Sequence, residues 1–187
     1  MLKTENVTTM EGMFSRCGSL AAISLNGLDT ANVKSMRAMF AGCSALAEAV
    51  FTGVNAGAIV DMGQMFDGCS SLSNLDLATF NTPNLTNADR MLSGCTALET
   101  LDLSGLNTAK TTNMGSFFGG CEALTEVKLG ADFVFHGETS WLPVGSWGSK
   151  VANDGGEEVT SFTARQIATE HVKIADTYPR EMMLTNA

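Results

Sequence analysis

The stretch Met91 to Leu106, M-L-S-G-C-T-A-L-E-T-L-D-L-S-G-L, decides the fold because most of the chain consists of copies of it. The copies follow one another at a fixed step of 26 residues, which is marked by Cys17, Cys43, Cys69, Cys95 and Cys121. A repeat of this period over most of a chain indicates a solenoid, in which each copy forms one coil and stacks on its neighbours.

Each copy has two halves with different apolar spacing. In the first half, residues such as Val33, Met36, Met39, Phe40 and Cys43 are spaced like one face of a helix. The second half reads L-x-x-L-x-L, and its last three residues alternate inward and outward as in a strand. We therefore expect helices at about 7–16, 33–42, 59–68, 85–94 and 111–120, and strands at 20–25, 46–51, 72–77, 98–103 and 124–129.

The predicted fold class is α/β. We expect a right-handed leucine-rich-repeat solenoid, in which one parallel sheet of about five strands forms one side and short helices cover the other. The period stops after Gly130. The sequence therefore predicts a solenoid of five repeats over residues 1–130 and a small α+β capping segment over residues 131–187.

The cysteines are expected to form a column of buried thiols. Equivalent residues of stacked coils lie about 4.8 Å apart with parallel side chains, whereas a disulfide needs Cβ atoms about 3.8 Å apart that face each other. There is no C-x-x-C and no histidine near the cysteines, so the pattern does not favour zinc. The acidic segment Asn153–Glu158 lacks the ligand spacing of a calcium loop and is interpreted as a solvated loop. We expect no metal and no cofactor.

No catalytic motif is present, so we expect no enzymatic activity. The net charge is -9 and there is no basic run, which argues against nucleic acid because a binder must neutralise phosphates. No apolar run has the length of a membrane span, so membrane insertion is not expected.

The repeat M-F-x-G-C-x-x-L-x-x-L-D-L-S, with N-V-x-x-M leading into the next Met-Phe, resembles the BspA-type leucine-rich repeat of bacterial surface proteins over roughly residues 2–130. The resemblance implies a cell-surface adhesion or protein-interaction module whose partner is a host matrix or cell-surface protein. The sequence shows neither a signal peptide nor a wall-sorting signal. An extracellular or cell-surface location is therefore implied by the resemblance alone.

The candidate binding site is the outward face of the strands, because solenoids usually bind partners there. Its candidate residues are Ser24, Glu48, Val50, Asn74, Asp76, Thr100, Asp102, Glu126 and Lys128. No aromatic anchor lies among them, so the alternative is that this face is merely the solvated side of the sheet.

Two further expectations concern the ends of the chain. Trp141, Trp147 and Tyr178 follow the repeats, and the alternative function is a carbohydrate-binding module in which they stack on sugar rings. At the other end, Leu2–Thr4 aligns with Leu28–Thr30, so the first coil lacks a covering strand. We expect end-to-end self-association at this N-terminal coil because it exposes apolar surface and a sheet edge.

Overall fold

The computed structural model describes residues 3–136, 143, 146–151, 158–163 and 182–186. Five of its strands recur along the repeats, and each lies within one of the expected strand ranges: β1 (Ala22–Ser24), β2 (Glu48–Val50), β3 (Asn74–Asp76), β4 (Thr100–Leu103) and β5 (Glu126–Leu129). Three more follow the repeats: β6 (Ser146–Val151), β7 (Glu158–Thr163) and β8 (Met182–Asn186).

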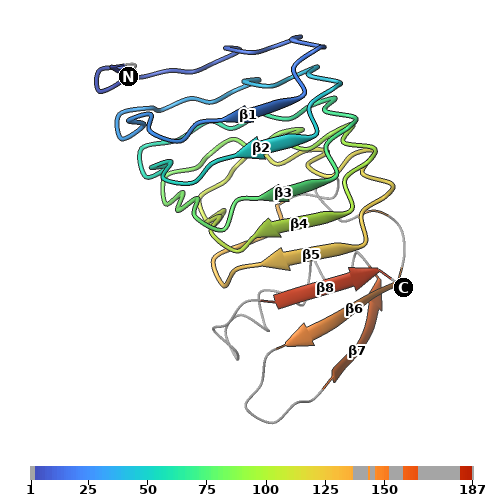
Figure 1. Ribbon diagram of the computed structural model, residues 1–187. Helices are drawn as coiled ribbons and strands as arrows, with labels where there is room; N and C mark the ends of the chain where they lie inside the picture. Colours follow the sequence, from blue (N-terminus) through green and yellow to red (C-terminus); the bar gives the residue numbers. More distant parts are fainter. Residues whose placement is uncertain (1–2, 137–142, 144–145, 152–157, 164–181, 187) are drawn as a thin grey trace.

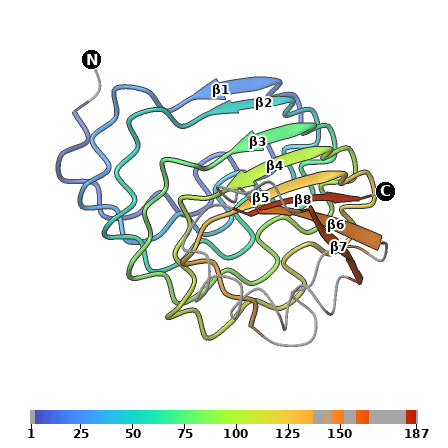
Figure 2. The ribbon, with the colours of Figure 1, turned by 90° about the horizontal axis from the view of Figure 1, so that it is seen from below.

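The repeats wind into a stack of coils, one coil to each step of 26 residues (Figure 1). Ala22 pairs with Glu48 and Asn74 pairs with Thr100 in parallel register, so the step is kept exactly from strand to strand. Half a repeat further along, single bridges with the same step link Thr9, Ser35, Asp61, Asn87 and Asn113. Viewed from below, β1–β5 lie along one side of the coils and turns close the rest of each coil (Figure 2).

The expected helices do not form. Within the described residues the structure contains no helix, so the predicted α/β class and its leucine-rich-repeat solenoid with short helices are wrong. Accordingly, no helix of this part of the chain could cross a membrane. In the range 33–42, Ala38 (φ 52°) and Gly42 (φ 75°) adopt the left-handed backbone region, and every coil has such a pair. Left-handed residues interrupt a right-handed helix because their backbone turns the opposite way.

Tight turns explain why the sequence pattern looked helical. The amide of Met39 donates to the carbonyl of Met36 (3.2 Å), and the amide of Cys43 donates to that of Phe40 (3.0 Å). These turns fold the segment so that residues three and four apart all point into the coil, where all four are fully buried. A helix would produce the same spacing of apolar residues, so the pattern cannot distinguish the two.

The single parallel sheet of about five strands is also wrong. β1 and β2 form one sheet, while β3, β4 and β5 belong to a second sheet with the order β3-β4-β5-β8-β6-β7. Its last three strands are antiparallel, and β8 pairs with β5 from Glu126 opposite Thr185 to Leu129 opposite Met182. In the described part of the expected α+β cap, the three strands therefore extend the sheet of the repeats.

Backbone hydrogen bonds join neighbouring coils in the turns, and most of them run forward along the chain. The amides of Met36, Ala38, Phe40 and Gly42 donate to the carbonyls of Asp61, Gly63, Met65 and Asp67 of the next coil, at 2.7–2.9 Å. The other neighbouring coils repeat this arrangement, beginning with the amides of Met10, Gly12, Phe14 and Arg16. These bonds replace the hydrogen bonds that a helix would have made within one repeat.

The core is a set of columns in which equivalent side chains stack. The rings of Phe14 and Phe40 lie 5.6 Å apart and nearly parallel, and Phe66 continues the column 5.5 Å from Phe40. Buried threonines join the coils: Thr82 Oγ1 donates to the carbonyl of Asn107 (3.1 Å) and accepts from its amide (3.0 Å). Ala56 occupies the equivalent position in its coil and has no hydroxyl, so that coil lacks this pair of bonds.

The first coil is more exposed than the coils that follow. Val7, Phe14, Leu20 and Ile23 are only partly buried, whereas their equivalents in the later coils are buried except for Ala49. Met13 is 55% exposed. Self-association at this coil, which was expected from the sequence, stays a prediction.

Candidate binding face

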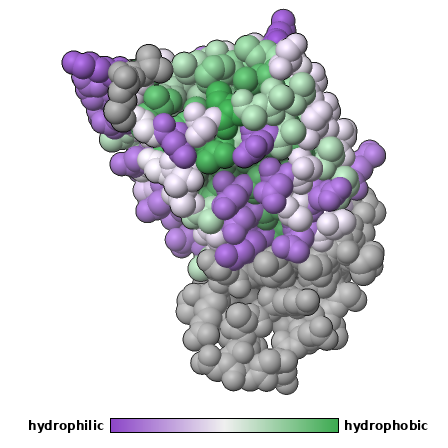
Figure 3. All heavy atoms as spheres, in the orientation of Figure 1, coloured by the Kyte–Doolittle hydropathy of each residue, from purple (hydrophilic) through white to green (hydrophobic). Residues whose placement is uncertain are grey.

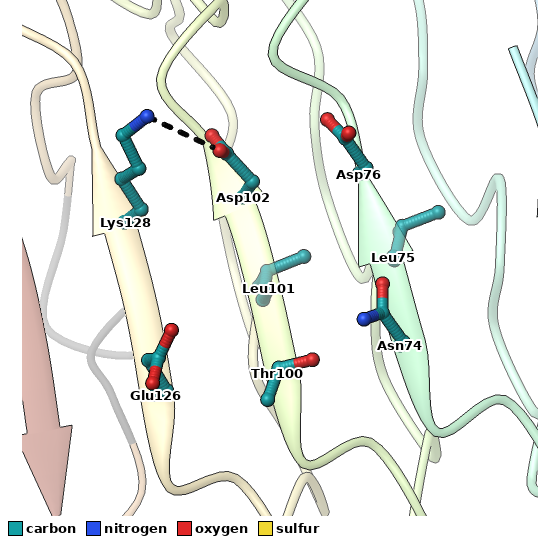
Figure 4. A pocket seen from close by; sticks show the side chains of 8 residues that line it. All are labelled: Asn74, Leu75, Asp76, Thr100, Leu101, Asp102, Glu126 and Lys128. Atoms are coloured by element: carbon teal, nitrogen blue, oxygen red, sulfur yellow. Dashed lines mark ion pairs between the residues drawn. The ribbon is translucent and has the colours of Figure 1, made fainter.

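All nine candidate residues lie on β1–β5, where they alternate with buried residues on β3, β4 and β5 and with partly buried ones on β1 and β2. The structure divides them into two groups, because the strands form two sheets. Ser24, Glu48 and Val50 lie on the small sheet of β1 and β2. The other six come together around one shallow pocket of about 190 Å³, with Leu75 and Leu101 at its floor (Figure 4): Asn74, Asp76, Thr100, Asp102, Glu126 and Lys128.

The two halves of this face differ in polarity (Figure 3). Polar side chains gather over β3, β4 and β5, whereas the surface over β1 and β2 is largely apolar. The strand sequences explain the difference, since β1 reads Ala-Ile-Ser and β3 reads Asn-Leu-Asp. The face therefore offers an apolar area next to a polar, mainly acidic one.

Asp102 is held in place by several partners. Its Oδ1 accepts from the amide of Ser104 (2.9 Å) and from the Ser104 hydroxyl (2.6 Å). Its Oδ2 lies 3.4 Å from Lys128 Nζ, and both side chains are 26% exposed. The pairing neutralises one carboxylate of the face, although an ion pair with this exposure contributes little to stability.

Asp76 occupies the equivalent place on β3 but has a different environment. Its Oδ1 accepts from the amide of Ala78 (2.9 Å), which repeats the turn made by Asp102. Within the described residues no cation pairs with Asp76, because its neighbour on β4 is Asp102 and the equivalent residue on β2 is Val50. The Asp76 carboxylate is therefore exposed and not neutralised.

Sequence reasoning missed a second pocket of about 210 Å³ beside Asp76. It is lined by Asp76 together with Ala49, Val50, Phe51, Thr52 and Thr79. The one feature of the sequence that could have indicated this pocket is Phe51, because the other repeats have leucine at the equivalent position: Leu25, Leu77, Leu103 and Leu129. A change to a larger residue in a core column indicates a local change of packing.

Residues of the alternative carbohydrate site are not placed by the structure. Trp141 and Tyr178 lie outside the described residues, and Trp147 is described only as part of the backbone of β6. Among the residues that are described, no three His, Cys, Asp or Glu side chains come together as a metal site.

Four of the five thiols are buried, as expected, whereas Cys17 on the first coil is exposed, and all five are free. Cys69 Sγ donates to the carbonyl of Phe40 (3.2 Å), and Cys95 Sγ donates to that of Phe66 (3.2 Å). Burial raises the pKa of Cys69 and of Cys121 to about 12, from the ordinary 9.0. Thiols of this kind are poor nucleophiles because only the thiolate attacks.

We expect a thiol reagent at pH 8 to modify Cys17 alone in the folded protein and all five thiols after denaturation. Thiol absorbance assays and mass spectrometry would measure this, with Cys17→Ser as the control that removes the fast reaction. Rapid modification of two or more thiols in the native state would contradict the buried column.

The buried thiols also predict how stability depends on pH. The unfolded chain loses thiol protons near pH 9, whereas folded Cys69 and Cys121 keep theirs to about 12. The free energy of unfolding should therefore fall as the pH rises above 9.

Comparison with known protein families gives one match. The family described as "Mycoplasma protein of unknown function, DUF285" matches residues 1–52 and 47–130. No curated protein and no solved structure matches the chain.

Proposed function

The chain belongs to the DUF285 family of Mycoplasma proteins of unknown function, and from this premise we propose that it is a non-enzymatic interaction module that binds a protein partner through the outward face of β1–β5. The observation that carries the proposal is the meeting of side chains from β3, β4 and β5 at one shallow pocket. Three successive repeats contribute to it, so a partner would contact several coils at once.

The size of the pockets supports a protein partner over a small molecule. Sites for small molecules and cofactors usually have volumes of about 300–1,000 Å³. The two pockets of the face, at about 190 and 210 Å³, are smaller and shallow. Pockets of this size suit single side chains of a partner polypeptide.

The resemblance of the repeat to BspA-type surface proteins supports the same class of function. It favours adhesion to a host matrix or cell-surface protein, with an extracellular or cell-surface location. The acidic residues of the face favour a basic partner surface, because complementary charges speed association and select partners.

The test is binding to a panel of purified extracellular matrix proteins by surface plasmon resonance, with a matched pair of variants. Glu126→Lys reverses a charge on the face, and Glu122→Lys makes the same change in the same coil away from it. We expect Glu126→Lys to weaken binding about tenfold or more, which is about 1.4 kcal/mol, and Glu122→Lys to have little effect. Equal affinities of the two variants, or no binding to any member of the panel, would count against the proposal.

A further inference from the structure

The hydrogen-bonded pairing of strands along the repeats is interrupted between β2 and β3. We call this boundary between the two sheets the seam. β1 pairs with β2 and β3 pairs with β4, but no hydrogen bonds join β2 to β3. On the opposite side the same two coils remain joined, for example by the amide of Phe40 donating to the carbonyl of Met65 (2.9 Å). The hydrogen bonds between these two coils are therefore interrupted on the side of the binding face.

Two buried aromatic rings account for the seam. Phe51 and Phe80 stand in columns where the other coils have smaller residues, such as Leu25 and Leu28. The rings lie 5.4 Å apart at an interplanar angle of 89°, and Phe51 also packs edge-on against Phe66 at 5.8 Å. Extra volume in a closely packed core displaces the backbone. The two rings thus fill the space between the coils at the place where β2 and β3 do not pair.

Within the described residues, no hydrogen bonds are formed across the seam by the backbone groups that face it. The amide of Leu25 donates to the carbonyl of Val50, and that of Leu77 donates to the carbonyl of Asp102. Successive residues of a parallel strand direct their backbone amide and carbonyl groups to opposite neighbouring strands. The backbone groups of Ala49 on β2 and of Asp76 on β3 are therefore directed towards the seam. No hydrogen bond joins them within the described residues. A ligand at the seam would therefore meet carbonyl oxygens that can accept hydrogen bonds.

The pocket of about 210 Å³ lies on this seam and combines two kinds of surface. Ala49, Val50 and Phe51 provide apolar surface, while Asp76 provides a carboxylate that no cation neutralises within the described residues. Across the face, Glu48, Asp102 and Glu126 add negative charge, and Lys128 is already paired with Asp102. The complementary ligand has an apolar stem and a cationic end.

We propose that the seam pocket is the anchor point of the binding face and takes an arginine side chain of the partner polypeptide. This inference rests on the proposed function and names the chemistry of its partner. The methylene groups of the arginine pack on Ala49 and Val50, and its guanidinium pairs with Asp76. Arginine fits better than lysine because its planar group has five donors, which serve a carboxylate and the seam carbonyls together.

The experiment titrates the full chain with N-acetylarginine amide and follows backbone amide shifts by NMR, with the uncharged N-acetylcitrulline amide as the control ligand. We expect shifts confined to Ala49–Thr52, Asp76 and Thr79 with the arginine amide, and none with citrulline. Asp76→Asn keeps the acceptor for the Ala78 amide and removes the charge, so binding should weaken about tenfold or more.

The matched control is Asp29→Asn, because Asp29 makes the same kind of turn with the amide of Ala31 (3.0 Å) and lies off the face. It should bind the arginine amide as the unchanged chain does. Three results would contradict the proposed arginine site. They are equal shifts with the citrulline amide, shifts centred on Glu126 and Lys128, and an equal loss of affinity for the arginine amide in the two variants.

The outcomes also separate the anchor from the proposed function. If Glu126→Lys abolishes matrix binding and Asp76→Asn leaves it unchanged, the function stands and the anchor fails. If the arginine amide binds at the seam and Glu126→Lys leaves matrix binding unchanged, the pocket stands as a site for arginine and the proposed function fails.

Discussion

Replacing Phe66 by alanine is expected to lower the free energy of unfolding by about 3–5 kcal/mol. The side chain is fully buried, stacks on Phe40 at 5.5 Å and contacts Phe51 edge-on at 5.8 Å. The cavity would lie between the central coils, and in a stack each coil is stabilised mainly by its neighbours. A domain with a total stability of about 5–15 kcal/mol would lose much of it.

Urea denaturation followed by circular dichroism measures this change as a lower midpoint. The control is Phe66→Leu, because Leu92 fills the same place in the next coil and is fully buried there. This variant should retain most of the stability. A loss below about 1 kcal/mol for Phe66→Ala would show that the phenylalanine column does not hold the coils together.

The second large effect concerns the column of left-handed residues formed by Arg16, Gly42, Gly68, Gly94 and Gly120. Gly94 has φ 75°, and a Cβ there would lie 3.2 Å from the Cα of Gly68. The left-handed region costs a residue with a side chain about 1–2 kcal/mol, and the close contact adds to it. Gly94→Ala should therefore destabilise the fold by about 2 kcal/mol or more.

Two other substitutions in the same column serve as controls. A Cβ at Gly68 would meet the Cα of Gly42 at an ordinary 3.7 Å, so Gly68→Ala should cost less than Gly94→Ala. Arg16 has φ 62° and already carries the strain, so Arg16→Gly should raise the stability by up to about 1 kcal/mol. Thermal and urea denaturation of the three variants would test this order, and a stabilised Gly94→Ala would refute the backbone argument.

The period and the outward residues could be predicted from the sequence because both follow from simple geometry. A repeat of 26 residues keeps equivalent residues in register, and alternation along a strand places Asp76 and Asp102 outward. The helices could not be excluded in the same way. Turns around Met36 and Phe40 bury residues at the spacing of a helix, and the left-handed backbone of Ala38 has no signal in its side chain.

The seam was beyond sequence reasoning for another reason. Phe51 was visible as an exception in its column, but its effect depends on Phe80, which lies across the boundary between two coils. Asp76 and Asp102 look identical in the sequence, yet the ion pair with Lys128 neutralises one and leaves the other exposed. The distinction arises from neighbours that are 26 residues away and become visible only once the coils are stacked.

The hydrogen bonds between the coils are unequal in their two directions. In the turns of one coil, the amides of Met36, Ala38, Phe40 and Gly42 all donate to the next coil along the chain, so their dipoles add as they do along a helix, whereas the amide of Lys34 donates back to Thr8. By the same register, the carbonyls of Thr9, Glu11, Met13 and Ser15 are the equivalents of the acceptors in the later coils. Any coil that packs on this side, from the same chain or from another, must therefore bring amide donors to them, which makes the stacking of coils directional.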